Sequence, residues 1–347
     1  MNSARNKSIV VSMLEAFAVG DAMGMPTEFM TRREIAAEFG RIDSLIPTER
    51  SAHHSELSTG SVTDDTEQTL YLLKRYCQDG AVSVEGTVAA LLAWIRETDA
   101  VAKHYIGPSS LKALQSIENG APVETAGTTG TTCGGIMRTL APVLCWHARH
   151  AASTGSGTLS SEAELLRCIR DCLVPTHNTS LALEAAGAYG FAIAAALRRL
   201  PLDGILESAL RGAESARSLA PYNSCGASSA SRIKFLASYV PTVSDSSDLL
   251  EFLFSVFGTG LESADVCSAV FGLFLHAKDD AWLAIRLAAE IGGDTDTVAA
   301  LVGALCAAYA GGHNIPAEIV DTVLTVNQLD VSAVEVQLQE VFADYES

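Results

Sequence analysis

Two short acidic clusters, far apart in the chain, contain the residues best suited to chemistry. The first acidic cluster is Thr63-Asp64-Asp65-Thr66, and the second is Gly292-Gly293-Asp294-Thr295-Asp296-Thr297. Together they supply four carboxylates and several hydroxyls, with no His or Cys among them. Ligand sets made only of oxygen suit hard cations such as Mg²⁺, Mn²⁺ or Ca²⁺. If folding brings the clusters together, they would form a site for one or two metal ions.

A structural explanation competes for each cluster. The carboxylates of the first cluster would lie in the first turn of a helix capped by Thr63, where they interact favourably with the helix dipole. The second cluster is harder to explain in this way. Asp294 and Asp296 precede the apolar segment 298–310, and uncompensated charges at a buried helix start are costly. A bound cation would compensate them, so we favour a shared site.

Three further features could contact a substrate. Two glycines and a proline break the first predicted helix and place Glu28 on a loop, as a solvated carboxylate or as a base beside the metals. The Gly/Thr-rich stretch 125–135, called the Gly/Thr loop below, can present amides and hydroxyls to a phosphate but lacks the Gly-Lys-Thr of a P-loop. His177 precedes an Ala-rich helix and is either a capping or core residue or a phosphate contact.

Composition restricts the class of protein. The chain has 347 residues, of which 48% are hydrophobic, and a formal net charge of −18. That charge argues against non-specific binding to nucleic acid or to an anionic membrane, although a small anionic ligand remains compatible with it. At roughly 150 residues per domain the length suggests two domains. Because we find no repeat and no linker, we predict a single domain over residues 1–347, acting as a monomer.

The N-terminus and the cysteines bear on location. A basic start is followed by an apolar stretch, but Glu15 and Asp21 interrupt it, so we predict a helix rather than a signal peptide. No apolar window reaches the roughly 20 residues of a membrane span, and the best candidates are 185–197 and 298–310. The eight cysteines include no CxxC pair. We expect free thiols in a cytoplasmic protein.

The apolar pattern is helical almost throughout. Apolar residues recur every three or four positions, Ala, Leu and Glu dominate, and alternating Val/Ile runs are nearly absent. Thr63, Ser83 and Ser161 precede acidic first turns and mark helix starts. We therefore predict an all-α fold, a compact orthogonal multi-helix bundle. The predicted helices are 8–20, 64–78, 84–97, 162–173, 178–199, 246–257, 262–277, 279–290, 296–310 and 316–327. The predicted loops are 51–62, 125–135, 151–161 and 221–231.

Taken in order, the motifs resemble those of the ADP-ribosylglycohydrolase family, which includes the enzyme that reactivates ADP-ribosylated dinitrogenase reductase. The resemblance runs from residue 20 to about 312, and the second acidic cluster, with Gly303 and Gly311 after it, is its most specific part. The matching motifs are Gly20-Asp21-Ala22-x-Gly24-x-Pro26-x-Glu28, Thr63-Asp64-Asp65-Thr66, Cys133-Gly134-Gly135-Ile136-Met137-Arg138 with Ala141-Pro142, Thr176-His177, and Gly292-Gly293-Asp294-Thr295-Asp296-Thr297.

The resemblance implies a dinuclear Mg²⁺ (or Mn²⁺) centre that hydrolyses the bond between ribose C1″ and an acceptor in an ADP-ribosylated protein or small ribosyl compound. ADP-ribosylarginine is the first expectation. Glu28 and Asp65 would act in catalysis, with Glu28 as base or gate and Asp21 orienting its loop. The implied substrate contacts near the diphosphate are Gly134, Gly135 and His177, and the implied metal ligands are Thr63, Asp64, Asp65, Asp294, Asp296 and Thr297.

Three other functions compete with this one. A hydrolase of a small N- or O-ribosyl compound, such as a nucleoside, would use the same metals; Cys133, where many family members carry Asn, leaves the ADP half of the substrate open. A prenyl-diphosphate or terpene synthase needs carboxylates at i and i+4, but Gln68 stands at that position and Asp294 and Asp296 are two apart. A non-enzymatic binding protein would have no reason to retain four carboxylates.

Overall fold

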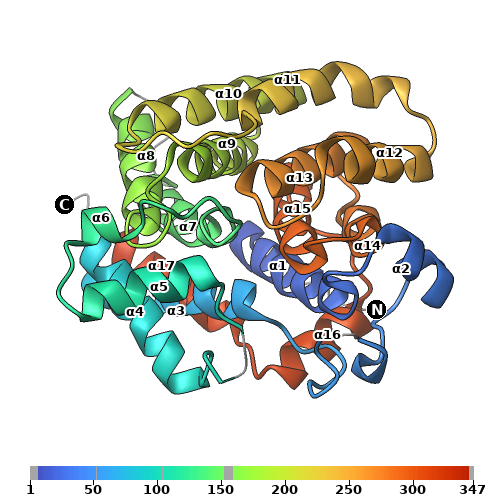
Figure 1. The fold of residues 1–347 in the computed structure, drawn as a ribbon, viewed down its shortest axis with the longest axis horizontal. Helices are drawn as coiled ribbons and strands as arrows, with labels where there is room; N and C mark the ends of the chain where they lie inside the picture. The colour runs from blue at the N-terminus through green and yellow to red at the C-terminus, as the bar shows by residue number, and fades with distance from the viewer. Residues whose placement is uncertain (1–6, 52, 103–104, 152–158, 344–347) are drawn as a thin grey trace.

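The regular structure of the chain is helical, as Figure 1 shows for the computed structural model, which describes residues 7–51, 53–102, 105–151 and 159–343. Within those residues there are seventeen α-helices and, in place of any strand, one isolated bridge between Thr132 and Glu262. The prediction of an all-α fold is confirmed. The helices are α1 (Ile9–Gly24), α2 (Arg32–Glu38), α3 (Asp64–Asp79), α4 (Val84–Thr98), α5 (Pro108–Glu118), α6 (Val123–Ala126), α7 (Leu140–His150), α8 (Leu159–Leu173), α9 (Ser180–Leu197), α10 (Leu202–Ser218), α11 (Ser229–Tyr239), α12 (Ser246–Phe252), α13 (Ser263–Ala277), α14 (Ala281–Ile291), α15 (Thr295–Ala310), α16 (Ala317–Val326) and α17 (Val331–Phe342).

Helix α1 crosses the middle of the molecule and packs along α15 (Figure 1). Two glycines on α1, Gly20 and Gly24, allow the two backbones to touch. A Cβ atom on them would lie 2.2 and 2.3 Å from a backbone oxygen of α15, closer than any real Cβ contact. The end of α1 is therefore held against the start of α15, which carries the second acidic cluster.

A carboxylate of α1 also fixes the start of α3. Asp21 accepts hydrogen bonds from the backbone N–H of Thr63 (2.9 Å) and of Thr66 (3.1 Å). It accepts from the hydroxyls of the same two threonines at 2.8 and 2.5 Å. Thr63 occupies the N-cap position as predicted, but its side chain forms no cap hydrogen bond within α3. The first acidic cluster is thus attached directly to the central helix.

A second long core helix, α9, packs against α10 through another pair of glycines. A Cβ atom on Gly187 would lie 2.4 Å from the carbonyl oxygen of Gly212, and the reverse distance is 2.3 Å. The expectation that no apolar helix reaches the length of a membrane span is wrong, because the segments Ile9–Thr27 and Ser180–Leu197 do. In both, 94% of the apolar window is buried inside the protein, as in core helices.

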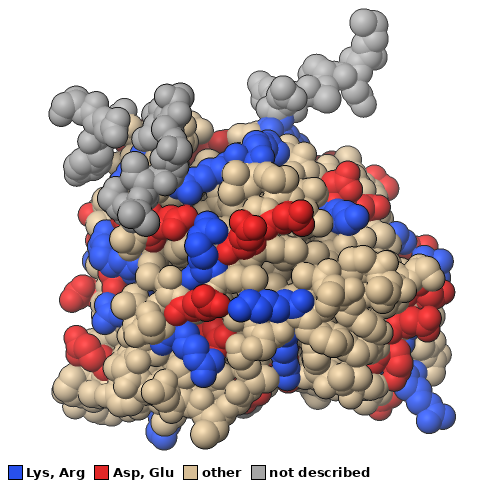
Figure 2. All heavy atoms as spheres, turned by 90° about the horizontal axis from the view of Figure 1, so that it is seen from above, with Lys and Arg blue, Asp and Glu red and all other residues tan. Residues whose placement is uncertain are grey.

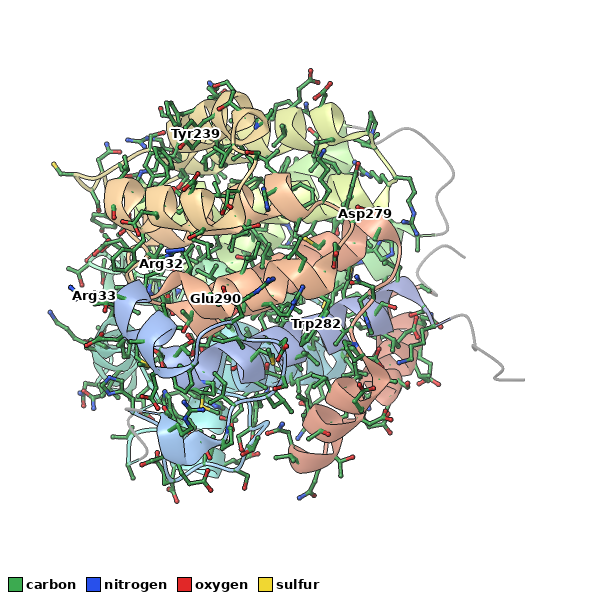
Figure 3. All side chains as sticks on the ribbon, turned by 90° about the vertical axis from the view of Figure 1, so that its right-hand side faces the viewer. Arg32, Arg33, Tyr239, Asp279, Trp282 and Glu290 are labelled. Atoms are coloured by element: carbon green, nitrogen blue, oxygen red, sulfur yellow. The ribbon has the colours of Figure 1, made fainter. Side chains whose placement is uncertain are left out.

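Helix α2 and the residues that follow it lie over the start of α12 and the end of α14. Arg32 of α2 donates a hydrogen bond to the hydroxyl of Ser247 at 2.7 Å, and Glu290 of α14 accepts one from the N–H of Ile42 at 2.8 Å (Figure 3). A π-helical turn (Leu253–Phe257) continues α12 as far as Gly258. These contacts hold the chain that follows Glu28.

All ten predicted helices correspond to helices of the structure, with ends that differ by up to a few residues. The predicted start at Ser83 is confirmed, since its hydroxyl accepts from the N–H of Gly86 at 3.0 Å. The start at Ser161 is wrong, because α8 begins at Leu159; part of the predicted loop 151–161 lies outside the described residues. The helices that the sequence did not reveal are α2, α5, α6, α7, α10, α11 and α17.

One large cluster of buried apolar residues extends from Val10 to Phe342, and a smaller one surrounds Trp94. Most helices contribute to the large cluster. On the face seen in Figure 2, acidic and basic side chains are interspersed rather than separated into patches. The buried polar side chains of the two acidic clusters lie within this apolar core.

Candidate active site

The two acidic clusters meet at the junction of α1, α3 and α15. The hydroxyl of Thr63 lies 3.3 Å from Oδ2 of Asp296, and the hydroxyl of Thr297 donates to Oδ2 of Asp65 at 3.2 Å. All four side chains are buried. Residues more than 230 positions apart in the sequence therefore share one site, as the oxygen-rich pattern led us to expect.

Gly293, which has a backbone conformation that favours glycine, positions the second acidic cluster. Gly293 has φ +82°, and a Cβ atom there would lie 2.0 Å from the carbonyl oxygen of Thr259. Its N–H donates to Met30 (2.9 Å), its carbonyl accepts from Phe29 (2.8 Å), and the N–H of Asp294 donates to Thr259 (2.8 Å). No larger residue fits this packing without moving the backbone. The loop after Glu28 and the segment at Thr259 thus fix Asp294.

Glu28 lies closer to the second acidic cluster than we expected. One oxygen atom from each of Glu28, Asp294 and Asp296 lies within 4.8 Å of the other two, a group able to hold a metal ion. Oε2 of Glu28 also lies 2.5 Å from Nε2 of His54. Sequence reasoning missed His54, which sits in the predicted loop 51–62 among residues with no distinctive spacing. Only the tertiary fold brings it to Glu28.

Burial and mutual repulsion disfavour the charged forms of the carboxyl groups at the site. Burial raises the pKa of four of them well above the ordinary value, and the negative charge of Asp296 raises each further. Burial, followed by Asp296, also raises the pKa of Asp21 to about 7, although hydrogen bonds from Thr63 and Thr66 act in the opposite direction. Removing these groups from water penalises their charged forms unless a cation is nearby. The four carboxyl groups whose pKa is raised well above the ordinary value are those of Glu28, Asp64, Asp65 and Asp294.

The donor set fits a divalent cation. Oδ1 of Asp65 and Oδ2 of Asp294 are buried with no hydrogen-bond partner, as is the hydroxyl of Thr259. Buried polar atoms are normally satisfied, and oxygen atoms of carboxylates and hydroxyls are the ligands that Mg²⁺ and Mn²⁺ prefer. A metal ion would satisfy the carboxylate oxygens and offset their mutual repulsion. Of the residues named as metal ligands from the sequence, Asp294 and Asp296 belong to the group that also contains Glu28, and Thr63 and Asp65 are hydrogen-bonded to Asp296 and Thr297, respectively.

The predicted substrate contacts also lie together. Nε2 of His177 is 3.0 Å from the hydroxyl of Thr132, in the Gly/Thr loop. A Cβ atom on Gly134 would lie 2.8 Å from Cε1 of His177, and one on Gly135 would lie 3.2 Å from its Cβ. The backbone of the Gly/Thr loop thus packs directly against the imidazole. His177 is fully buried, with its ring against this loop.

A short segment joins the Gly/Thr loop to the second acidic cluster. The N–H of Cys133 donates to the carbonyl of Leu261 (2.7 Å), and the N–H of Ser263 donates to Thr131 (2.9 Å). Two residues before Leu261, Thr259 accepts the hydrogen bond from Asp294 described above. The phosphate-binding candidate and the metal-binding candidate are therefore parts of one connected site.

Comparison with known proteins agrees with this arrangement. Residues 2–345 match the family described as ADP-ribosylglycohydrolase. YegU of Escherichia coli (strain K12) is 28% identical over 326 residues, which cover 92% of this chain and 93% of that protein. The ADP-ribosyl-[dinitrogen reductase] glycohydrolase of Rhodospirillum rubrum is 33% identical over 79 residues, 23% of this chain and 26% of that enzyme. A solved structure titled "ADP-ribosylglycohydrolase-related protein complex" has the same fold, with a TM-score of 0.65 and 23% identity over 97% of this chain and 98% of that one.

Proposed function

This chain belongs to the ADP-ribosylglycohydrolase family, a family of glycosidase-type hydrolases that act on ADP-ribosyl compounds, and from this membership we propose that it is a divalent-metal-dependent hydrolase of ADP-ribosylated acceptors. The observation that carries the proposal is the meeting of the two acidic clusters around carboxylate oxygens that have no partner. Family members in general depend on a metal. A purely structural role would not require buried, unpaired carboxylates.

The metal would be Mg²⁺, with Mn²⁺ as a substitute, and two ions are proposed. When bound, they supply Lewis-acid polarisation of oxygen atoms on the ribose or on water. The carboxylates would in addition face the positive charge that develops on a ribose ring as its C1″ bond breaks. The residues proposed to hold the ions are Thr63, Asp64, Asp65, Asp294, Asp296 and Thr297.

Glu28 is the proposed base. In the hydrolysis, the bond from ribose C1″ to the acceptor breaks, the oxygen of a water molecule bonds to C1″, and a proton from that water passes finally to the released acceptor. His54 holds Oε2 of Glu28, which leaves Oε1 to take the proton. Burial raises the pKa of Glu28, which strengthens it as a base. Asp65, whose Oδ1 has no partner, is proposed to orient the water.

ADP-ribosylarginine is the proposed substrate. The support is the relative from Rhodospirillum rubrum, which is named for an ADP-ribosylated protein, together with the motifs shared with its family. The Gly/Thr loop, with Gly134 and Gly135 packed on His177, would receive the diphosphate through its backbone amides. The formal net charge of −18 argues against a nucleic acid as a partner.

The test is a comparison of substrates with and without metal. Purified protein is incubated with an ADP-ribosylarginine protein, an ADP-ribosylserine peptide and a panel of nucleosides, in Mg²⁺ and in chelator. We expect ADP-ribose to be released from the arginine-linked protein in Mg²⁺ only. Release from serine alone would change the acceptor, and cleavage of nucleosides alone would replace the proposal with a small-ribosyl hydrolase. Equal release in chelator would refute the dependence on metal.

A further inference from the structure

Arg138, at the end of a short 3₁₀-helix (Ile136–Arg138), is fully buried beside the site. In the part of the chain that the structure describes, no carboxylate forms an ion pair with it, although burying an unpaired charge is costly. A guanidinium stays protonated and has only donors. Arg138 therefore supplies a fixed positive charge and a set of donors whose direction is known.

One chain of hydrogen bonds leads from Arg138 to the first acidic cluster. Nη1 of Arg138 donates to Oε1 of Gln68 at 3.4 Å, and Nε2 of Gln68 donates to Oδ2 of Asp64 at 2.9 Å. Because Arg138 cannot accept, the amide of Gln68 must turn its oxygen to the guanidinium and its NH₂ to Asp64. The arginine thus decides which end of the amide meets the carboxylate.

A second chain leads from Arg138 to the Gly/Thr loop. Nη2 donates to the hydroxyl oxygen of Thr176 at 2.5 Å, and that hydroxyl lies 2.8 Å from Nδ1 of His177. Nη2 itself lies 3.4 Å from the same Nδ1. Because the guanidinium of Arg138 and the hydroxyl of Thr176 both present hydrogen atoms to Nδ1 of His177, Nδ1 must be the acceptor. The proton of the neutral ring is therefore on Nε2, which donates to the hydroxyl of Thr132 at 3.0 Å. The hydroxyl proton of Thr132 is then free for an outside acceptor.

The neutral state of His177 agrees with this direction. Burial lowers the pKa of His177 well below its ordinary value, and the positive charge of Arg138 lowers it further. A neutral imidazole has one donor and one acceptor, which is what the two neighbouring threonines require. Each contact along the two chains then pairs a donor with an acceptor, while Nε of Arg138 is buried with no partner.

We propose that Arg138 is a positioning residue that sets the direction of both chains, so that Asp64 is oriented as a metal ligand and the Thr132 hydroxyl is oriented as a donor to an anionic group of the substrate. The identities of the metal and of the anion, a phosphate, rest on the proposed function. Groups that orient metal ligands in this way typically change metal affinity about 10- to 100-fold when they are removed.

The first test titrates Mn²⁺ calorimetrically into protein stripped of metal. Gln68→Met keeps the side-chain length but removes the hydrogen bonds to Arg138 and Asp64. Arg138→Lys keeps the positive charge but loses the guanidinium, whose two terminal nitrogens donate to the two hydrogen-bond chains. We expect each to weaken Mn²⁺ binding at least about 10-fold. The double variant should be no weaker than the worse single variant, because both remove one path. Unchanged affinity in Gln68→Met, or additive losses, would overturn the proposal.

Tyr189→Phe serves as the matched control. Tyr189 is fully buried and donates to the carbonyl of Leu301 at 3.0 Å, between α9 and α15 and outside both chains. We expect a lower melting temperature and unchanged Mn²⁺ affinity. If this variant weakens Mn²⁺ binding as much as Gln68→Met does, the effect is general loosening and the proposal fails. Should Arg138→Lys not fold, Gln68→Met against this control still decides.

The second test uses neither metal nor substrate. In chelated protein labelled with ¹⁵N at histidine, the ring nitrogens of His177 report its tautomer. We expect a neutral ring with the proton on Nε2 near neutral pH. A proton on Nδ1, or a doubly protonated ring, would overturn the proposed direction of the second chain. If wild-type protein bound no Mn²⁺, the metal part of the proposed function and the Asp64 end of this inference would both be refuted, and the tautomer would decide the Thr132 end separately.

Discussion

Asp296 is the carboxylate to which the rest of the site is coupled. Its Oδ2 meets the hydroxyl of Thr63, and its charge contributes to raising the pKa of every other carboxyl group described at the site. A metal ion that binds between the clusters would offset the repulsion between Asp296 and these groups. Asp296 is therefore the residue whose charge should be most closely tied to metal binding.

We predict that Asp296→Asn abolishes hydrolysis while the protein stays folded. Asn has the same shape, but a neutral amide is a weaker ligand for a hard cation. Loss of Lewis-acid assistance worth several kcal/mol lowers the rate by about 1000-fold or more. Hydrolysis of ADP-ribosylarginine and the far-UV circular dichroism spectrum provide the measurement. Activity within tenfold of wild type would show that this carboxylate does not hold the metal.

We predict that Glu28→Gln lowers turnover by about 100- to 10,000-fold, the range of general acid–base catalysis, and leaves metal affinity nearly intact. His54 holds one oxygen of Glu28, and the amide of Gln preserves that contact in shape. Assays of hydrolysis are paired with metal titration calorimetry. Because Glu28 lies within 4.8 Å of Asp294 and Asp296, loss of metal in this variant would make it a ligand instead. Full activity would make it a passive carboxylate.

At the scale of residues, the sequence revealed the groups with unusual chemistry and missed those with ordinary partners. Asp64 and Asp296 stood out because charged residues precede buried helices. Gln68 and His54 gave no local signal, since a glutamine on a helix and a histidine in a loop occur in any protein. Their roles depend on which neighbour they face, and that is decided by tertiary packing.

At the scale of elements, capping illustrates the same limit. Local rules predicted that Thr63 would cap α3 with its own side chain. In the structure Asp21, more than 40 residues earlier, accepts the hydrogen bonds from the first turn of α3. Sequence reasoning located the start of the helix correctly. A cap supplied by another helix satisfies the same backbone groups, and local spacing does not show it.

Glycine explains why α10 was missed. Gly204 and Gly212 lower its helix propensity by about 1 kcal/mol each relative to alanine. Gly212 is nevertheless required, because a Cβ atom there would lie only 2.3 Å from the carbonyl oxygen of Gly187 in α9. Close packing of two helices thus outweighs propensity. Sequence rules treat such a residue as a helix breaker.

We predict that Gly24→Ala destabilises the protein by about 3 kcal/mol, the upper end of overpacking costs, and weakens metal binding. The added Cβ would lie 2.3 Å from the carbonyl oxygen of Thr295 and 2.5 Å from Cα of Asp296, which are backbone atoms that must move. Gly204→Ala is the control, because its Cβ meets only ordinary contacts of 3.4 Å or more. It should be neutral or stabilising by about 0.4–1 kcal/mol. Urea unfolding and metal titration measure both, and equal stabilities would contradict the close approach of α1 and α15.

At the scale of the whole molecule, Glu15 joins the N-terminal region to the segment after α15. It accepts from Lys7 at 2.8 Å and meets His313 at 2.8 Å. Burial acts to raise the pKa of Glu15, but the hydrogen bonds from His313 and Lys7 outweigh it and hold the pKa below 4.5. A lowered pKa in the folded state means that the charged form stabilises the fold above pH 4.5 and that this contribution is lost as the pH falls further.

We predict that Glu15→Gln lowers the free energy of unfolding by about 1 kcal/mol near neutral pH, as expected for hydrogen bonds to a charged group with one exposed partner. The difference from wild type should shrink as the pH falls below 4.5, where Glu15 of the folded protein gains a proton. Urea unfolding of both proteins across this range measures it. A difference that stays constant into acid would show that the charge of Glu15 is not responsible.

The sequence predicted the class of fold because ten segments carried strong helical periodicity and the acidic motifs matched one family from end to end. It could not show how α1, α3 and α15 approach one another, since that depends on backbone contacts at Gly20 and Gly24. The proposed metal would join the starts of α3 and α15, and α1 is joined to them through Asp21, which accepts hydrogen bonds from Thr63 and Thr66. Binding of the metal should therefore be visible in the stability of the entire chain and not only in catalysis.

We predict that Mg²⁺ or Mn²⁺ raises the melting temperature of metal-free protein and that chelator lowers it. A ligand that binds only the folded state adds RT ln(1 + [L]/Kd), about 2.7 kcal/mol at a hundredfold excess over Kd. Relief of repulsion among buried carboxylates such as Asp65 and Asp294, each with an unpartnered oxygen, is the physical source of that affinity. Asp296→Asn is the control, because without its charge the shift should largely disappear. Identical melting curves for wild type in chelator and in excess Mg²⁺ or Mn²⁺ would mean that the two acidic clusters meet without forming a metal site.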